Sequence, residues 1–234
     1  MSAGQNYLKV VYNESRTPKT EYPRQLIEYL VKRFALRQSD TLLEPGCGRG
    51  DFLLEFKRAG LTCFGLDREP ESFDGHREIE VRHCDLAKDA FPFDDGSLDV
   101  VYHKSMLEHL YDPSLLMTET YRVLKPGGKL IILTPDWHSQ YLNFFEDFTH
   151  CRPYDVTSLA DLMAIFRFQD VSAERFHQLP FVWRHSWCKV LTALLRVFFS
   201  AHSARNWSRV LRIKSLRWSV ELMILGFGRK PGNA

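Results

Sequence analysis

The fold of this chain is decided at Leu42-Leu43-Glu44-Pro45-Gly46-Cys47-Gly48-Arg49-Gly50-Asp51, which joins an apolar strand to an amphipathic helix through three closely spaced glycines. Glycines at alternate positions let the backbone adopt conformations closed to other residues, and they leave the main chain open to a ligand. The pattern indicates a cofactor-binding turn. The alternative is an ordinary glycine-rich connection between a strand and a helix.

Two carboxylates flank this turn. Glu44 ends the strand, and Asp51 stands where the dinucleotide fingerprint Gly-x-Gly-x-x-Gly requires a small residue. A pyrophosphate would face both acids, whereas a ligand that carries an ammonium or sulfonium group would be attracted by them. The turn therefore favours a cationic cofactor and argues against a nicotinamide-dependent oxidoreductase.

The segment from Glu44 to Gly50 resembles motif I of the class I S-adenosylmethionine-dependent methyltransferases, (Asp/Glu)-x-Gly-x-Gly-x-Gly. The resemblance covers about residues 40 to 135 and is to the branch that contains the quinone C-methyltransferases and many small-molecule O- and N-methyltransferases. Its further motifs are Asp67, Cys84-Asp85-Leu86, Ser105-Met106-Leu107-Glu108-His109-Leu110 and Arg122-Val123-Leu124-Lys125-Pro126-Gly127-Gly128. The resemblance implies S-adenosylmethionine as the cofactor.

Short apolar runs alternate with amphipathic stretches, which predicts an α/β fold with a doubly wound, Rossmann-like sheet. The expected strands are 41–44, 61–67, 79–85, 98–103, 129–134 and 168–176, and the expected helices are 21–34, 51–59, 113–124 and 157–166. The resemblance adds a seventh, antiparallel strand at 220–227. Residues 178–218 would then be a helical insertion in a single domain that spans residues 1–234.

The composition points to a cytoplasmic protein. The chain has 234 residues, of which 44% are hydrophobic and 26% charged, enough for one substantial core. Its five cysteines include no Cys-x-x-Cys pair and predict neither a disulfide framework nor a zinc site, so we expect no metal. No signal peptide or membrane-spanning run is expected.

Residues at the carboxyl ends of parallel strands are the candidates for cofactor binding. Asp67 is placed to accept the ribose hydroxyls, or else is a strand-end acid in solvent. By resemblance, Asp85 with Leu86 reads the adenine, although Asp-Leu is also an ordinary helix start. The full set of expected cofactor-binding residues is Glu44, Gly46, Gly48, Gly50, Asp67, Arg68, Asp85, Leu86, His103, Ser105 and His109.

Methyl transfer needs a base only when the acceptor must lose a proton. His150 is the preferred candidate and His138 the reserve, and either could instead be a surface or hydrogen-bonding histidine. Trp137, Tyr141 and Arg152, from the same region after strand five, are the candidates for acceptor binding.

We therefore expect methyl transfer from S-adenosylmethionine to an oxygen or nitrogen of a small-molecule, sugar or lipid-linked acceptor. A nucleic-acid acceptor is disfavoured, because His103-Lys104-Ser105-Met106 replaces the Asn/Asp-Pro-Pro-Tyr/Phe motif of amino-methylating enzymes. The alternatives are an RNA methyltransferase that uses the basic C-terminal region and a protein that binds the cofactor without turnover.

Residues 181–234 contain ten Lys or Arg but one acid, Glu221. Within this basic region, apolar residues recur at steps of three and four and predict an amphipathic helix. They are Trp187, Val190, Leu191, Leu194, Leu195 and Phe198. One interpretation is a lid whose apolar stripe packs on the core while the arginines stay in water. The other is a peripheral membrane contact through residues 187–218, in which arginines and tryptophans meet an anionic surface.

Overall fold

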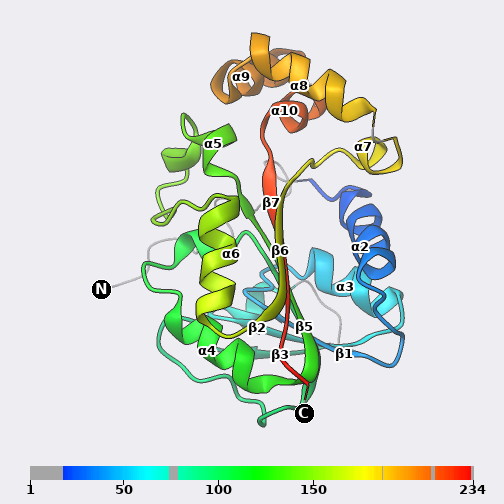
Figure 1. Ribbon diagram of the computed structural model, residues 1–234, viewed down its shortest axis with the longest axis vertical. Coiled ribbons are helices and arrows are strands. Elements are labelled where there is room, and N and C mark those ends of the chain that lie inside the picture. The colour runs from blue at the N-terminus through cyan, green and yellow to red at the C-terminus, as the bar shows by residue number, and fades with distance from the viewer. Residues whose placement is uncertain (1–17, 74–78, 186, 212–213, 233–234) are drawn as a thin grey trace.

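The computed structural model describes residues 18–73, 79–185, 187–211 and 214–232. Its strands form a seven-stranded sheet in the order β3-β2-β1-β4-β5-β7-β6, in which β7 runs antiparallel to both neighbours (Figure 1). The strands are β1 (Thr41–Pro45), β2 (Thr62–Asp67), β3 (Glu80–His83), β4 (Leu98–Lys104), β5 (Leu124–Pro135), β6 (Gln169–Phe176) and β7 (Met223–Arg229). The expected Rossmann-like sheet with its antiparallel last strand is confirmed.

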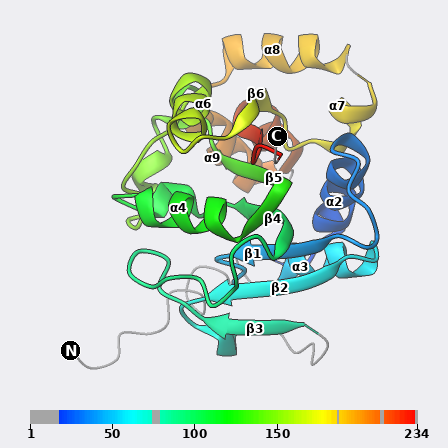
Figure 2. The same cartoon turned by 60° about the horizontal axis from the view of Figure 1, so that its bottom comes forward.

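Helices cover both faces of this sheet. Helices α2 (Tyr22–Arg33) and α3 (Asp51–Arg58) lie on one face, and α4 (Ser114–Val123) and α6 (Val156–Ile165) lie on the other (Figures 1 and 2). Shorter turns follow the strand ends: η1 (Pro70–Ser72), η2 (Leu107–His109), α5 (Trp137–Gln140) and η3 (Phe144–Glu146). The turn η1 follows β2 directly.

The strand sequences supply both halves of the core. Successive side chains of a strand point to opposite faces, so the neighbours Leu42 and Leu43 enter different clusters. Leu42 packs with Leu26 and Phe56 from the α2 and α3 side, and Leu43 belongs to the cluster on the α4 and α6 side. Each fully buried side chain of this kind contributes about 1.5–3 kcal/mol. Near-continuous apolar runs are therefore what a sheet covered on both faces requires.

All seven strands differ from the sequence expectation at one end or both, and the largest difference is that β5 begins at Leu124 rather than at residue 129. β3 is confined to Glu80–His83 because Cys84 and Asp85 already turn away at the edge of the sheet. β4 continues one residue beyond His103, to Lys104. β7 begins at Met223 rather than at Val220, which is the last residue of a helix.

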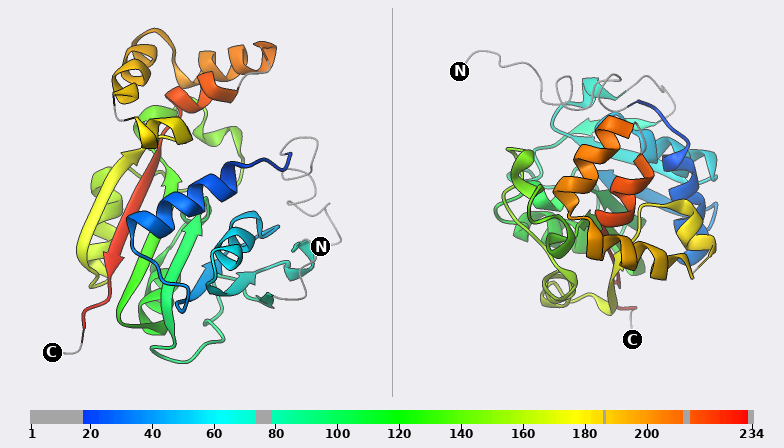
Figure 3. Two further views of the ribbon diagram at one scale, coloured as in Figure 1. Left: turned by 90° about the vertical axis from the view of Figure 1, so that its right-hand side faces the viewer. Right: turned by 90° about the horizontal axis from the view of Figure 1, so that it is seen from above.

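A helical cap, which we define as α7 to α10, fills the connection between β6 and β7. It consists of α7 (Pro180–Arg184), α8 (Cys188–Phe198), α9 (Ala201–Leu211) and α10 (Lys214–Val220) and forms one end of the molecule (Figure 3). Met223 pairs with Pro135 and with Phe176, so the cap leaves the sheet at the edge where β5 ends. None of the helices in the described part of the chain is both long and apolar enough to cross a membrane.

The packing expected of a lid is not what the structure shows for α8. Its buried residues are Cys188 and Thr192, whereas Trp187, Leu194 and Phe198 of the apolar stripe are 64%, 54% and 79% exposed. The amphipathic helix itself is present, with its apolar face turned outward. The side chains of Arg209 and Arg212, part of the basic pattern, lie outside the described residues.

One buried carboxylate ties the cap to the rest of the protein. Glu221 is 1% exposed and accepts from Arg205 Nε at 2.9 Å and from Arg217 Nε at 2.6 Å. Arg205 also pairs with Glu146 of η3. Since Glu221 is the only acid of the C-terminal region, its charge organises α9, α10 and η3 together.

We expect Glu221→Gln to destabilise the protein by about 3 kcal/mol, because removing one partner of a buried ion pair leaves the other charge uncompensated. Urea unfolding followed by circular dichroism measures this loss. Glu174→Gln is the matched control: its pair with Arg33 is half exposed, so about 1 kcal/mol or less is expected. Equal losses for the two variants would contradict an anchoring role for Glu221.

Candidate active site

The glycine turn between β1 and α3 crosses the carboxyl end of β2. The N–H groups of Gly46 and Cys47 both donate to the carbonyl oxygen of Leu66, at 2.7 and 3.1 Å, and Gly48 N–H donates to Asp67 Oδ2 at 2.8 Å. Gly46 has φ +71°, and a Cβ there would lie 2.6 Å from Met106 Sδ. The first glycine is therefore required by both its backbone conformation and its close contact.

A cavity of about 550 Å³ opens beside this turn. A volume of this order is typical of small-molecule and cofactor sites. The residues that line it come from the ends of β1, β2 and β4, from the turns that follow these strands and β3, and from the segment after η3. They are Glu44, Gly46, Cys47, Gly48, Arg49, Asp51, Phe52, Asp67, Arg68, Glu69, Cys84, Asp85, Leu86, Ala87, Lys104, Ser105, Met106, His109, Leu110, Phe148 and Thr149.

Glu44 is a buried carboxylate at the wall of this cavity. It is 3% exposed, and its Oε2 has no hydrogen-bond partner among the described residues. Burial raises the pKa of Glu44 well above its ordinary value, and the charge of Asp51 raises it further. An unpaired buried carboxyl group is costly, so this site favours a ligand group that is cationic and can donate a hydrogen bond.

His103 does not line the cavity. It is fully buried, neither ring nitrogen has a partner among the described residues, and burial lowers its pKa to about 4. β4 extends one residue further than the sequence indicated, and side chains alternate along a strand. Lys104 is therefore the residue that reaches the cavity, with its Nζ 5.2 Å from the centre of the Phe52 ring.

Lys104 lies between two buried acids. Burial lowers the pKa of Lys104, whereas the charges of Glu108 and Glu44 raise it. Glu108 is fully buried, and its Oε2 accepts from Thr134 Oγ1 at 3.0 Å. Burial raises the pKa of Glu108 to about 7, so this carboxyl group changes charge near neutral pH.

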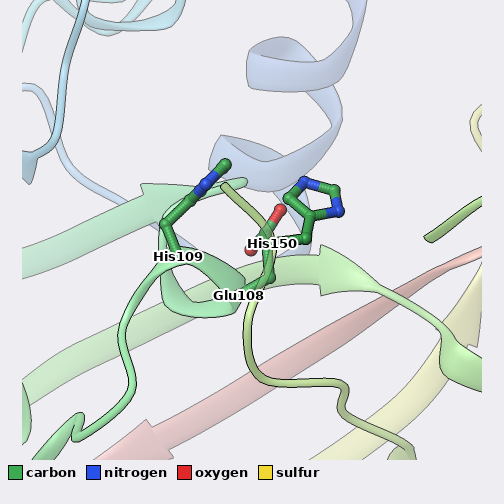
Figure 4. A group of neighbouring side chains, drawn as sticks. All are labelled: Glu108, His109 and His150. Carbon is green, nitrogen blue, oxygen red and sulfur yellow. The ribbon is translucent and has the colours of Figure 1, made fainter. Parts of the chain in front are cut away.

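Glu108, His109 and His150 form a cluster (Figure 4). One ligand atom from each lies within 4.8 Å of the others, and the two imidazole rings are 4.8 Å apart between centroids. His109 Nδ1 lies 2.8 Å from Thr149 Oγ1. These residue types could act in proton transfer or hold a divalent cation, although the sequence had suggested no metal.

The backbone fixes the tautomer of His150. Its Nδ1 lies 2.7 Å from the carbonyl oxygen of Phe144, so Nδ1 carries the proton and donates it. Nε2 is then left with its lone pair. Burial lowers the pKa of His150, against the charge of Asp147, which raises it, so the ring is neutral at pH 7. A neutral imidazole with an available Nε2 has the properties of a general base.

Two aspartates lie at the cavity, Asp67 at the end of β2 and Asp85 two residues after β3. Asp67 accepts from Gly48 N–H and, through Oδ1, from Glu69 N–H at 2.9 Å. Asp85 accepts from Ala87 N–H at 3.1 Å and pairs with Lys88, so it also caps its own turn. Carboxylate oxygens accept more than one hydrogen bond, so both aspartates keep acceptor capacity towards the cavity.

The structure thus brings most of the expected cofactor residues together. Those that line the cavity are Glu44, Gly46, Gly48, Asp67, Arg68, Asp85, Leu86, Ser105 and His109. Gly50 stands apart because the Phe73 ring packs where its Cβ would be. His150 lies beside the cavity through its contact with His109.

The other residues expected after β5 lie away from the cavity lining. His138 is an exposed residue 4.0 Å from Asp136, and Arg152 donates to the carbonyl oxygen of Tyr111 at the surface. Trp137 packs against Phe144, and Tyr141 is 56% exposed. Trp137 is connected to the cluster indirectly, because the Phe144 ring also packs against the His150 ring, with centroids 4.7 Å apart.

Sequence reasoning missed several residues of the lining, chiefly Lys104, Phe148 and Thr149. Lys104 could have been found from strand alternation if the end of β4 had been placed correctly. Phe148 and Thr149 belong to an irregular segment, which has no periodicity that shows which side chains point inward.

Residues 43–132 match the family described as methyltransferase domain. A probable S-adenosylmethionine-dependent methyltransferase of Mycolicibacterium smegmatis is 34% identical over 117 residues, which are 47% of this chain and 44% of that protein. A ubiquinone/menaquinone biosynthesis C-methyltransferase of a Geobacter species is 30% identical over 142 residues, 54% of this chain and 58% of that protein. The chain therefore spans about half the length of these relatives.

A solved structure of a putative methyltransferase from Haloferax volcanii, in complex with a methyltransferase activator, is similar in fold. It aligns over 98% of this chain and 100% of that chain, with a TM-score of 0.69 and 16% identity. The agreement extends to the whole described sheet. The family match over residues 43–132, the S-adenosylmethionine-dependent methyltransferase relative and the seven-stranded topology show that this chain contains a methyltransferase domain with the Rossmann-like methyltransferase fold.

Proposed function

We propose that this protein transfers a methyl group from S-adenosylmethionine to an oxygen or nitrogen of a small-molecule, sugar or lipid-linked acceptor. The observation that carries the proposal is that one feature lies in the cavity wall and a second lies beside the same cavity. Glu44 presents a buried carboxyl oxygen without a partner among the described residues, and His150 presents a neutral ring nitrogen at the neighbouring cluster.

The cavity fits the cofactor of this family. Glu44 would face the cationic methionine portion, since a positive charge offsets the cost of its burial. Gly46 and Gly48 would leave the backbone open to the same portion, and Asp67 would accept from the ribose hydroxyls. Asp85 and Leu86 would meet the adenine.

S-adenosylmethionine supplies an electrophilic methyl group on a sulfonium, whose sulfur keeps the bonding electron pair when the methyl leaves. The protein has three tasks: it holds the acceptor in line, excludes water and takes the acceptor's proton. His150 Nε2 would accept that proton while Phe144 holds the ring in place through Nδ1. General-base assistance of this kind contributes about 10²–10⁴ in rate.

The proposal also states which atom of the acceptor is methylated, an oxygen or a nitrogen. A placed neutral histidine suits an acceptor that loses an O–H or N–H proton. The Geobacter relative is named a C-methyltransferase, so the product must be characterised. Incubation of the protein with the cofactor and pools of candidate acceptors, followed by mass spectrometry, should show a gain of one methylene group. Cofactor binding with no methylated product from any pool would favour the alternative of a binding protein without turnover.

An RNA acceptor is less well supported. Much of the basic C-terminal charge is engaged within the protein: Arg205 and Arg217 with Glu221, and Arg196 with the carbonyl oxygen of Ser219 at 3.2 Å. Phosphate binding needs cations that are exposed to the nucleic acid. These three arginines serve the cap instead.

Asp67→Ala should weaken cofactor binding by about ten- to a hundredfold, because a charged acceptor in a buried site contributes about 1.5–3 kcal/mol. Isothermal titration calorimetry with S-adenosylmethionine measures the change. Glu174→Ala, far from the cavity in β6, is the control and should bind normally. Unchanged affinity in a folded Asp67→Ala protein would remove this residue from the site.

His150→Ala should lower turnover by about 10²–10⁴-fold while cofactor affinity stays the same, because the base acts only in the chemical step. His138→Ala is the matched control, since His138 is exposed and apart from the cluster. Added imidazole should partly restore His150→Ala. Full turnover of His150→Ala at saturating acceptor would show that positioning alone suffices.

Loss of turnover on chelator treatment, restored by a divalent cation, would assign the cluster of Glu108, His109 and His150 to metal binding instead.

Turnover should fall in acid with a midpoint below about 6.5, the ordinary pKa of histidine, because burial lowers the pKa of His150. The His150 imidazole is then neutral, and able to accept a proton, around pH 7. Glu108→Gln should leave this acidic limb in place and remove any inflection near pH 7, where Glu108 titrates. A pH profile of kcat under saturating substrates measures both. An acidic midpoint above 7 would contradict the assignment of His150.

A further inference from the structure

Helix α8 turns its apolar face away from the protein. Large apolar side chains recur along it at steps of three and four and are between 49% and 79% exposed. They are Trp187, Val190, Leu191, Leu194, Val197 and Phe198. Exposed apolar surface of this extent on one helix face commonly marks an interaction site.

The polar contacts on the inner face fix this orientation. Thr192 is 2% exposed, and its Oγ1 donates to the Lys189 carbonyl oxygen at 2.9 Å and lies 2.8 Å from His177 Nε2. Arg196 donates to the carbonyl oxygen of Ser219. Rotating α8 to bury its apolar face would break these bonds and leave the buried partners, His177 and the Ser219 carbonyl group, without them. The outward apolar face is therefore built into the packing of the cap.

Helix α9 likewise turns large apolar side chains outward. Its buried residues are small, Ala201, Ala204 and Ser208, and they allow close packing against α10. Trp207 and Val210, in contrast, are 51% and 74% exposed. Both helices lie at the end of the molecule where β7 begins, away from β1, β2 and β3 (Figures 1 and 3).

The charge of the cap is of one sign. Residues 180–220 contain eight Lys or Arg and no Asp or Glu. Arg184, at the end of α7, and Lys189, in the first turn of α8, are exposed. A second copy of the cap would bring only like charges to a symmetric contact, which disfavours self-association through this surface. An anionic lipid surface complements both the charge and the apolar area.

We propose that the outward faces of α8 and α9 bind the surface of an anionic lipid bilayer. The apolar side chains would enter the boundary between headgroups and acyl chains, and Arg184 and Lys189 would meet the lipid phosphates. This contact is independent of methyl transfer. The pairing of Arg205 with Glu146 places α9 beside the segment that carries Phe148 and His150. If the proposed function also holds, a lipid-linked acceptor would reach the cavity from the membrane.

Flotation of the full chain with vesicles tests the proposal. Vesicles of phosphatidylcholine with phosphatidylglycerol should carry the protein upward at low salt, and high salt should weaken this binding because it screens the cationic side chains. Vesicles of phosphatidylcholine alone should bind it at least about tenfold more weakly, since the cationic side chains then gain nothing.

The double variant Leu191→Ser with Leu194→Ser should lower the partition coefficient on anionic vesicles by at least about tenfold, because two apolar contacts are lost. Ile165→Ser is the matched control: Ile165 is 74% exposed but lies on α6, so its variant should bind as the unchanged protein does. Lys189→Glu, which adds an acid to the cap, should weaken binding and reduce its salt dependence. Cofactor affinity should be the same in all of these proteins.

Four results would overturn the proposal. The first is no binding to anionic vesicles. The second is binding that the double variant and Ile165→Ser reduce equally, which would indicate non-specific adsorption. The third is a dimer at micromolar concentration that the double variant dissociates in the absence of lipid, since a second copy would then cover the surface. Salt-sensitive retention on RNA without vesicle binding would likewise contradict it.

Discussion

The site depends on how three consecutive N–H groups of the glycine turn are satisfied at the end of β2. Leu66 offers its carbonyl oxygen to Gly46 and Cys47, and Asp67 offers its carboxylate to Gly48. These bonds bend the chain across the sheet edge before α3 begins. They also leave Glu44, at the end of β1, facing the cavity with an unpaired oxygen. The backbone of one turn therefore sets both the shape of the cavity and its preference for a cationic ligand.

The cap is connected to the lining of the same cavity at two places. Arg205 bridges the buried Glu221 and Glu146, and Glu146 lies two residues before Phe148 in the cavity wall. Trp218 of α10 packs on Tyr22, with ring centroids 5.1 Å apart, and Tyr22 in turn contacts Phe52 of the lining. The insertion is thus joined to the segment that carries Phe148 and to Phe52, two parts of the cavity lining, while its own apolar face points outward.

Local signals in the sequence were sufficient for the first six strands and the glycine turn, because each of these is specified by residues close together in the chain. The antiparallel seventh strand was expected only from the family resemblance. The error at His103 came from ending the strand one residue too early: the last strand residue is Lys104, whose side chain points to the face opposite that of His103 and reaches the cavity. The orientation of α8 could not be read from its period. Amphipathicity reveals an apolar face, whereas the contacts of Thr192 and Arg196 with distant residues decide which way it points.

The central claim is that Glu44 makes this a site for a cationic cofactor. Because burial raises the pKa of Glu44, binding of a cation should favour its ionised form and release a proton. Calorimetric titration of S-adenosylmethionine at pH 7, in two buffers of different ionisation enthalpy, measures that release. The unchanged protein should release a proton on binding, whereas Glu44→Gln should release none and should bind the cofactor more weakly by about tenfold or more. Equal affinity and equal proton release in the two proteins would contradict it.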